Sequence, residues 1–532
     1  MSRKRKKRTD QTSGSQVIVV HPPLTGSPEF MAESAPGVTT VVREETSTVV
    51  ARNAPIAEPV AKATPTAPSH GERALGLDAL RGALLLAMTF AMTIPFGAFP
   101  TWMYHMQNPP PDGAFAAIAG ITWRDLLFPG FLFTMSAAIP ITNSLRLGKG
   151  MPYPAVVFTA IKRFALLMLF AYIIGHVNPY WTEDYTRRGN LMAIAGFLIC
   201  WPLFTRKPAN WNERTHGIVR MIGWLAVAAL LFAGPLLYGA RFSLERRDGI
   251  IASLAFCSLA ATCIWLATRT RPQIRVAIIA AIAAAKLAAT TPGWVQDFWA
   301  ATPAAWLYES WYLELMIIVL AGTIAGDLLL QWMRPRAATE AALEWSPLRL
   351  LSIAVVCMAF TPIVLVGLYN RRGDVTAGLA IAVAIAGAFL LLQPTSRRDR
   401  TLATLYAWAT VWIGLGLLLE PFEGGIKKVP QTLSYLALTA GLSTAWLIAA
   451  LIITDMVRHG RRLTRPLIEV GQNPLMAYIV FMLFLNHIAY ASGVGNLLTA
   501  TWWQAVLRGL LFTLVAGAIV MAATRRRLFW RA

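Results

Sequence analysis

Long apolar stretches recur along the chain from Leu75 to the C-terminus, and short polar segments separate them. Many extend over about 18 residues or more, the length that an α-helix needs to cross a hydrocarbon core of about 30 Å. Their apolar positions show no sustained period of two, so helices are favoured over barrel strands. The pattern therefore predicts an all-α fold, a polytopic transmembrane helical bundle.

We predict twelve to fourteen spans, because the segments 164–178, 190–204 and 275–291 are short and also suit tilted or re-entrant helices. The predicted spans cover residues 78–99, 126–143, 164–178, 190–204, 218–239, 250–267, 275–291, 311–332, 350–369, 375–392, 402–419, 433–453, 467–490 and 504–523.

Residues 1–72 differ from the rest of the chain. They begin with a run of Lys and Arg and continue rich in Pro, Ala, Thr, Ser, Glu and Val. No apolar run follows the basic residues, so the segment does not read as a signal peptide. Its composition predicts a disordered cytoplasmic tail, either solvated or in contact with anionic lipid. The expected organisation is therefore a tail over 1–72 and a membrane domain over 73–532.

Charge is sparse and unevenly placed along the chain. Only 14% of the residues are charged, and the net charge is +21. A basic protein can bind nucleic acid, but here Lys and Arg lie in short loops between apolar spans, which is a pattern of membrane topology. The loops predicted to be cytoplasmic hold 25 Lys and Arg residues, and the loops on the other side hold 10. We therefore expect both termini in the cytoplasm and no nucleic-acid partner.

Some polar residues lie inside or beside the spans, where they are costly and point to function. Asn473 begins a late span, and Glu314 and Lys286 fall within apolar runs. Lys286 is expected to reach an interface with its long side chain. The four cysteines lie in apolar segments without metal-ligand spacing, so we expect buried thiols and no metal. They are Cys200, Cys257, Cys263 and Cys357.

The first cluster with possible chemistry lies where the first span begins. Asp78 and Arg81 are three residues apart, so they share a helix face and can pair. Such a pair can anchor a helix at the membrane surface. It can also face the phosphates of a cofactor, because Arg suits phosphate recognition. The residues alone leave both interpretations open.

The second cluster lies on the outer side. His105 follows the first span, and Asp125 stands at the start of the next one. Imidazole titrates near neutrality and can act as a general base when a carboxylate orients it. The loop can fold His105 back toward Asp125, but an interfacial histidine and a helix cap are the structural alternatives. His176 and His487 are the other histidines expected on this side.

A resemblance follows from these motifs. The pattern Arg-x-x-x-Leu-Asp-x-x-Arg-Gly at 73–82, the His-bearing outer loop, and Thr-x-x-Asp-Leu-x-Phe-Pro-x-Phe-Leu-Phe at 122–133 resemble the heparan-α-glucosaminide N-acetyltransferase family. Two later segments agree, at 423–435 and at Val-Gly-Gln-Asn-Pro, 470–474. In the lysosomal enzymes of that family the histidine stands closer to the aspartate, at a place held here by Phe115. His105 therefore takes the role by residue type and location.

The resemblance implies a transmembrane acyltransferase. It would move an acetyl group from cytosolic acetyl-CoA to an amino or hydroxyl group of a sugar or glycan on the other side of the membrane. His105 would act as general base or as a transient acetyl carrier, and Asp125 would orient it. Asp78, Arg81 and Asn473 are the residues expected to bind acetyl-CoA.

The expected setting is the lipid bilayer of a bacterial inner membrane, and the acceptor would then be an envelope glycan. The alternative is a transporter or flippase for a sugar or lipid-linked substrate, which also accounts for many spans with polar residues. No clear internal repeat supports it. The oligomeric state stays open, with a homodimer as one option.

Overall fold

The computed structural model describes residues 73–111, 113–207, 211–238, 242–302, 304–334 and 345–530. The predicted tail over 1–72 lies outside the described residues. Across the described ranges there is no named strand, and one antiparallel bridge pairs Thr205 with Trp530. Twelve helical stretches within these ranges are long and apolar enough to cross a membrane. The predicted all-α polytopic bundle is therefore confirmed.

The twelve stretches are α1 (Leu75–Thr93), α2 (Trp123–Gly148), α3 (Tyr153–Val177), α6 (Glu213–Tyr238), α7 (Gly249–Thr268), α10 (Trp311–Trp332), α12 (Pro347–Tyr369), α13 (Gly373–Leu390), α14 (Arg397–Leu419), α15 (Leu433–Leu451) with the π-helical η3 (Ile452–Met456), α18 (Pro474–Ile479) with the π-helical η4 (Val480–Leu485) and α19 (Asn486–Ala491), and α20 (Trp502–Arg525). The other described helices are η1 (Thr101–Met103), α4 (Pro179–Thr182), α5 (Arg187–Phe204), α8 (Pro272–Ala288), α9 (Trp294–Ala300), η2 (Pro421–Glu423), α16 (Gly460–Leu463), α17 (Arg465–Gly471) and η5 (Val494–Asn496).

Several boundaries differ from the predicted ones for physical reasons. α3 begins at Tyr153, although we expected a short span from residue 164, because Lys162 and Arg163 are exposed on a helix that continues past them. α1 ends at Thr93, just before the Ile94–Pro95 pair, since a residue before proline avoids the helical region. The segment predicted over 467–490 is broken at Pro474, which cannot continue α17 because it has no N–H.

α8 lies antiparallel to α10 along most of its length. Arg275 in its first turns pairs with Asp327, and Lys286 in its last turn pairs with Glu314 at 2.8 Å. Lys286, which we expected to reach an interface, thus forms an ion pair between two helices. With 17 residues, α8 is shorter than the helices counted as spans, yet it joins the two ends of the bundle.

α5 likewise runs between the two ends. Near its start Asn190 contacts His487, with 2.7 Å between Oδ1 and Nδ1, and just after its end Thr205 bridges to Trp530. All fourteen predicted segments are therefore helical, although α5 and α8 fall outside the twelve. We call the end of the bundle at which α1 ends and α2 begins the His105 end, and the opposite end the Asn473 end.

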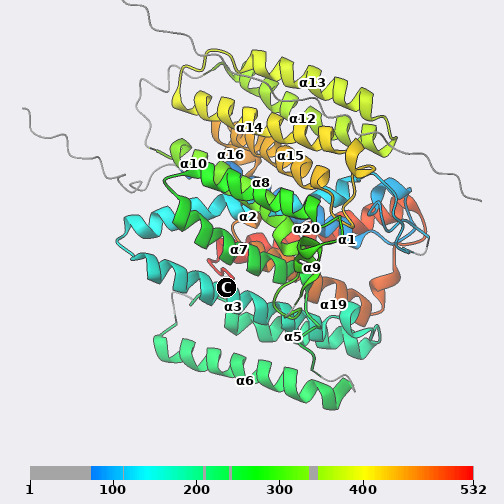
Figure 1. The fold of residues 1–532 in the computed structure, drawn as a ribbon. Coiled ribbons are helices and arrows are strands. Elements are labelled where there is room, and N and C mark those ends of the chain that lie inside the picture. The colour runs from blue at the N-terminus through cyan, green and yellow to red at the C-terminus, as the bar shows by residue number, and fades with distance from the viewer. Residues whose placement is uncertain are drawn as a thin grey trace, which may run out of the picture. The chain divides into compact units, whose positions relative to one another are not determined.

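The core of the bundle lies around α15. The most apolar stretch of α15 and η3 is 89% buried. Figure 1 shows α12, α13 and α14 on one side of it and α3, α5 and α6 on the other. α1 and α17 approach closely through glycines: a Cβ on Gly82 would lie 1.9 Å from Leu467 O. Three of the cysteines are buried as expected, but Cys263 is exposed on α7 because it lies on the outward face of that helix.

Candidate functional site

Two loops meet at the His105 end of the bundle. The first connects α1 with α2, and the second connects α14 with α15. Gly120 N donates to Ile426 O at 2.7 Å, and Lys428 N donates to Gln107 Oε1 at 3.3 Å. The buried Gln107 amide also donates to the carbonyls of Ile118 and Gly120, at 2.9 and 3.1 Å. The loops therefore hold each other in place.

The residue before the histidine is fixed by its own packing. Tyr104 is fully buried, and its hydroxyl donates to Pro95 O at 2.7 Å and accepts from Phe99 N at 3.1 Å. Its backbone carbonyl accepts from the hydroxyl of Thr122 at 2.6 Å. This anchor directs His105 toward the start of α2.

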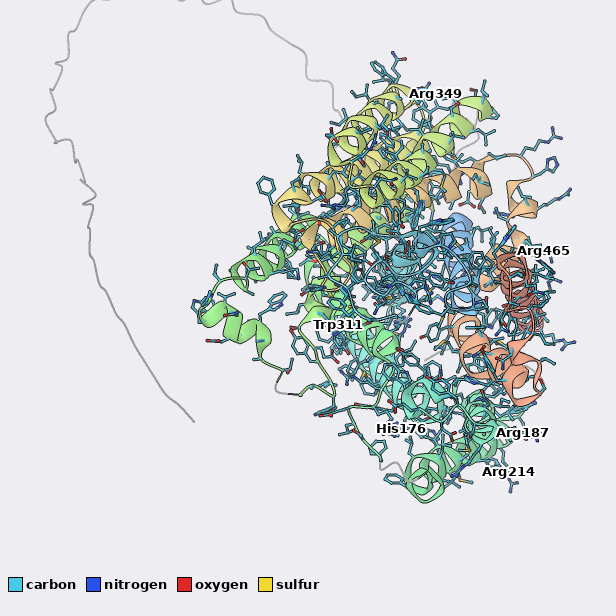
Figure 2. The ribbon with its side chains drawn as sticks, turned by 90° about the vertical axis from the view of Figure 1, so that its right-hand side faces the viewer. His176, Arg187, Arg214, Trp311, Arg349 and Arg465 are labelled. Atoms are coloured by element: carbon cyan, nitrogen blue, oxygen red, sulfur yellow. The ribbon has the colours of Figure 1, made fainter. Side chains whose placement is uncertain are left out.

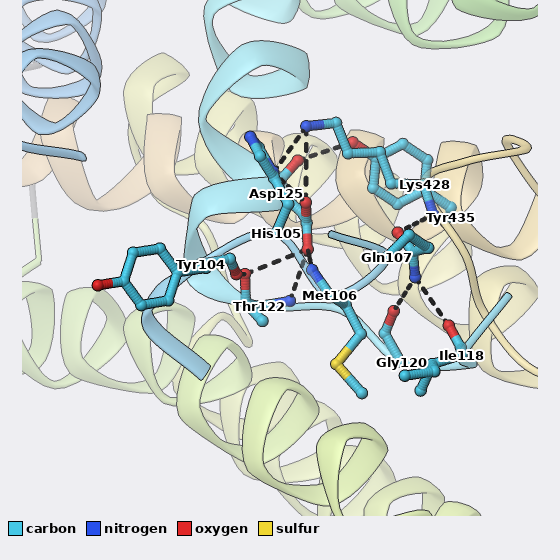
Figure 3. Close-up of polar contacts among 10 residues, drawn as sticks. All are labelled: Tyr104, His105, Met106, Gln107, Ile118, Gly120, Thr122, Asp125, Lys428 and Tyr435. Carbon is cyan, nitrogen blue, oxygen red and sulfur yellow. Dashed lines mark hydrogen bonds and ion pairs between the residues drawn. The ribbon is translucent and has the colours of Figure 1, made fainter. Parts of the chain in front are cut away.

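Asp125 lies at the third position of α2 and is fully buried. Its Oδ2 accepts from Thr122 N at 3.0 Å and from Met106 N at 3.3 Å, so this oxygen caps the helix and holds the loop. Its Oδ1 lies 2.6 Å from His105 Nδ1. The two carboxylate oxygens thus have separate partners, and the expectation that the loop folds His105 back toward Asp125 is confirmed (Figure 3).

Lys428 joins the pair from the second loop, as Figure 3 shows. Its Nζ lies 3.0 Å from His105 Nδ1 and 3.5 Å from Asp125 Oδ1. Tyr435, in the first turn of α15, donates its hydroxyl to Asp125 O at 2.7 Å and ties α15 to α2. From the sequence, Lys428 was notable only as part of the 423–435 segment and was not predicted as a site residue.

The protonation of the His105–Asp125–Lys428 cluster follows from these distances. A 2.6 Å contact between a ring nitrogen and a carboxylate needs a proton between them, so His105 Nδ1–H donates to Asp125. Lys428 then faces the same carboxylate as an ammonium. Burial first, and the charge of Lys428 next, lower the pKa of His105 from 6.5 to about 4, while Asp125 opposes both. Burial also lowers the pKa of Lys428. The imidazole is therefore neutral at pH 7.

The second ring nitrogen of His105, Nε2, is the atom of the cluster that could react with a substrate. Nε2 has no hydrogen-bond partner among the described residues, and 33% of the side chain is exposed. A neutral imidazole with Nδ1–H held by a carboxylate presents a basic lone pair at Nε2. This arrangement can accept a proton from, or attack, a group that approaches from outside the protein.

The other two outer histidines lack this feature. His176 contacts Tyr172 O through Nδ1 and accepts from Ser243 N through Nε2. His487 contacts Asn190 through Nδ1 and Met482 O through Nε2. Both ring nitrogens of each are occupied by the protein. Of the three histidines considered, His105 alone has an unoccupied ring nitrogen in the described structure.

Asp78 and Arg81 lie apart from this cluster, at the Asn473 end. Arg81 donates to Asp78 at 3.2 Å, to Gly471 O at 3.3 Å and to Thr134 O at 3.0 Å. Asp78 also pairs with Arg73 at 3.2 Å. The predicted pair is therefore present, and its polar atoms hold α1 against α2 and the end of α17.

Asn473 is fully buried, and its amide binds the C-terminal segment. Nδ2 donates to Leu528 O at 2.9 Å, and Oδ1 accepts from Trp530 N at 3.0 Å. The three residues predicted for acetyl-CoA binding thus share the Asn473 end, and each has protein partners there. Within the described ranges, no group of three or more His, Cys, Asp or Glu residues could hold a metal ion.

Residues 73–329 match the model of a protein family described as a domain of unknown function, DUF5009. The match covers just under half of the chain. It includes His105 and Asp125 but ends before the loop that carries Lys428. No curated protein matches the chain.

Proposed function

We propose that the chain is an integral-membrane acyltransferase, which moves an acetyl group from acetyl-CoA to an amino or hydroxyl group of a sugar or glycan. The observation that carries the proposal is the His105–Asp125–Lys428 cluster. It combines a neutral imidazole, a buried carboxylate that orients it, and an unoccupied Nε2 at the end of a membrane bundle. The sequence motifs at 73–82 and 122–133 support the same chemistry.

The chemical step assigns one role to each residue. His105 Nε2 removes a proton from the acceptor nitrogen or oxygen as this atom attacks the thioester carbonyl. A bond from the acceptor to the acetyl carbon forms, the carbon–sulfur bond breaks, and CoA leaves as a thiolate that recovers the proton. Alternatively, Nε2 attacks the thioester carbonyl first and the carbon–sulfur bond breaks as CoA leaves. The acceptor then attacks the acetyl group on Nε2, the bond to Nε2 breaks, and the acceptor's proton passes to the CoA thiolate.

Asp125 and Lys428 act on the imidazole from the Nδ1 side. Asp125 holds the Nδ1–H tautomer and offsets the positive charge that forms when Nε2 is protonated. Lys428 disfavours that charge in the resting state and keeps the imidazole free of a proton at neutral pH. Their opposed effects keep His105 neutral at rest and still able to receive a proton.

Asp78, Arg81 and Asn473 support the donor end in this proposal. They position α1, α17 and the C-terminal segment around the end at which acetyl-CoA would enter. With the loop charges as a guide, this end faces the cytoplasm and the His105 end faces the periplasm of a bacterial inner membrane. The acceptor would then be an envelope glycan.

The test uses inverted membrane vesicles that contain the full chain. Labelled acetyl-CoA is added outside, and amino sugars and envelope glycans are enclosed in the lumen as acceptors. We expect labelled product with wild type and with His176→Ala, the matched control, and no product with His105→Ala or Asp125→Asn at equal expression. Equal labelling by His105→Ala would refute the role of the cluster. Substrate flux without CoA, together with no labelling, would favour the transporter or flippase.

A further inference from the structure

An exposed group of arginines lies at the Asn473 end and takes no part in the proposed acyl transfer. It is built from two segments, the turn and short helices after η3 and the last turn of α20 with the residues after it. We call this group the arginine patch. Its members are Arg458, Arg461, Arg462, Arg465, Arg525, Arg526 and Arg527, all exposed.

The first segment reverses direction sharply, and this places its arginines close together. His459 has a φ of 64°, and a Cβ on Gly460 would lie 1.7 Å from Ile453 O, so the turn needs a glycine there. α16 and α17 follow at once. The patch residues of this segment thus fall within one tight turn and the two short helices that start from it.

Glu469 holds the two segments together. Its Oε1 pairs with Arg465 Nε at 2.8 Å, and its Oε2 pairs with Arg525 Nε at 2.8 Å. Its backbone carbonyl accepts from the Thr524 hydroxyl at 2.9 Å. Both guanidinium groups stay largely open to solvent, with 67% and 56% of the side chains exposed. The ion pairs therefore use one nitrogen of each arginine and leave the others for a ligand.

A second acidic residue, Asp455, lies in η3 just before the turn that carries Arg458 and Arg461. Its Oδ2 accepts from Gly76 N at 3.2 Å, at the start of α1. Two carboxylates cannot neutralise seven arginines, so the patch keeps a clear positive charge. This surplus attracts anionic partners.

Two features indicate that the partner is a lipid. The segments of the patch leave the bundle where two spans end, at Met456 and Arg525, so the arginines lie at headgroup depth. Leu463, which lies between Arg462 and Arg465 in the sequence, is 77% exposed. Such exposure is unusual for a leucine facing water and suits contact with acyl chains. Arginine binds phosphate oxygens through paired N–H groups, and basic clusters beside a span attract anionic lipids.

We propose that the arginine patch binds the phosphate headgroups of acidic phospholipids in the leaflet that surrounds the Asn473 end. Leu463 enters the acyl region, and the arginines contact the phosphates above it. A bound headgroup bridges the turn after η3 and the end of α20, which back the α1–α17 contact. This binding does not depend on the proposed acyl transfer.

The experiment uses the purified full chain in neutral detergent, with native mass spectrometry to count bound lipid. Dioleoyl phosphatidylglycerol is titrated against dioleoyl phosphatidylcholine. We expect the wild type to prefer phosphatidylglycerol and Arg461→Gln/Arg462→Gln to lose about thirtyfold in its affinity, since each arginine contributes about 1 kcal/mol and 1.4 kcal/mol is tenfold. Leu463→Ser should lower the affinity for phosphatidylglycerol several-fold.

The matched control is Arg214→Gln/Arg271→Gln, which also removes two exposed arginines. Figure 2 shows Arg214 well separated from Arg465 of the patch. The control should bind phosphatidylglycerol as the wild type does. An equal loss in the control, or no loss in the patch variant, would overturn the proposal. Displacement of the lipid by an equal concentration of glycerol 3-phosphate would overturn it too, because the patch would then bind soluble phosphate.

Discussion

Replacement of Lys428 by methionine tests the electrostatics of the site most directly. Methionine keeps the aliphatic bulk and removes the ammonium that lies 3.0 Å from His105 Nδ1. A positive neighbour disfavours the imidazolium, so its removal raises the pKa of His105 above about 4. Burial, the larger cause, remains in the variant, and the pKa should therefore stay below 6.5.

The size of the change follows from the charges around the ring. Two unit charges 4 Å apart interact by about 4 kcal/mol at an effective dielectric constant of about 20, or about 3 pKa units. A third of the His105 side chain is exposed, and Lys428 is also partly exposed, so solvent screening reduces the interaction well below this value. We therefore expect a net rise of about 1 unit. At pH 5 the neutral fraction of His105 would fall from about nine-tenths to about half.

The assay is modification of His105 by diethyl pyrocarbonate, which reacts with neutral imidazole, followed by peptide mass spectrometry between pH 3.5 and 8. It needs no substrate and is independent of the proposed activity. Lys427→Met is the control. It removes the charge of the residue next to Lys428, and no described contact joins the Lys427 side chain to His105. A midpoint for Lys428→Met at or below that of the wild type, or an equal rise in the control, would refute the reasoning.

Three further predictions follow from single contacts. Asp125→Asn removes the negative partner of His105, so its modification midpoint should fall below about 4. Asn473→Ala leaves one buried and one partly buried backbone group unpaired and should lower the free energy of unfolding by about 2 to 4 kcal/mol, measured by denaturation in detergent. Gly82→Ala should cost more than about 2 kcal/mol in the same measurement, because its Cβ meets a backbone carbonyl. Its control is Gly217→Ala, which has open space around its Cβ and should be neutral or stabilising by up to about 1 kcal/mol.

The helices and the His105–Asp125 contact could be predicted from sequence because both depend on local information. The length of an apolar stretch predicts a span. A carboxylate three residues into a helix, such as Asp125, lies close to the loop that leads into that helix. The predicted start of α3 was wrong because Lys162 and Arg163 were taken to lie outside the helix. Both can lie at an interface without ending it. Local patterns thus give the existence of an element more reliably than its ends.

Lys428 could not be found in this way. It is 323 positions from His105 in the chain, and its own loop carries no motif that sets it apart from Lys427. Its place depends on how α14 and α15 pack against α2, which includes the Tyr435 bond to Asp125. Asn473 shows the converse case: a buried amide at a helix start serves a ligand or a backbone segment equally well, and only the fold reveals Leu528 and Trp530 as its partners.

Asp125 explains why a capping role and the proposed catalytic role could not be separated from the sequence. One oxygen, Oδ2, accepts the backbone N–H groups of Thr122 and Met106, as a cap requires. The other, Oδ1, faces His105 and Lys428. An aspartate that only caps its helix has no need for a histidine and a lysine at the second oxygen, and burying a carboxylate with charged neighbours is costly. The same helix start therefore accounts for the rigid position of Asp125 and, through its second oxygen, for the tautomer that leaves His105 Nε2 open.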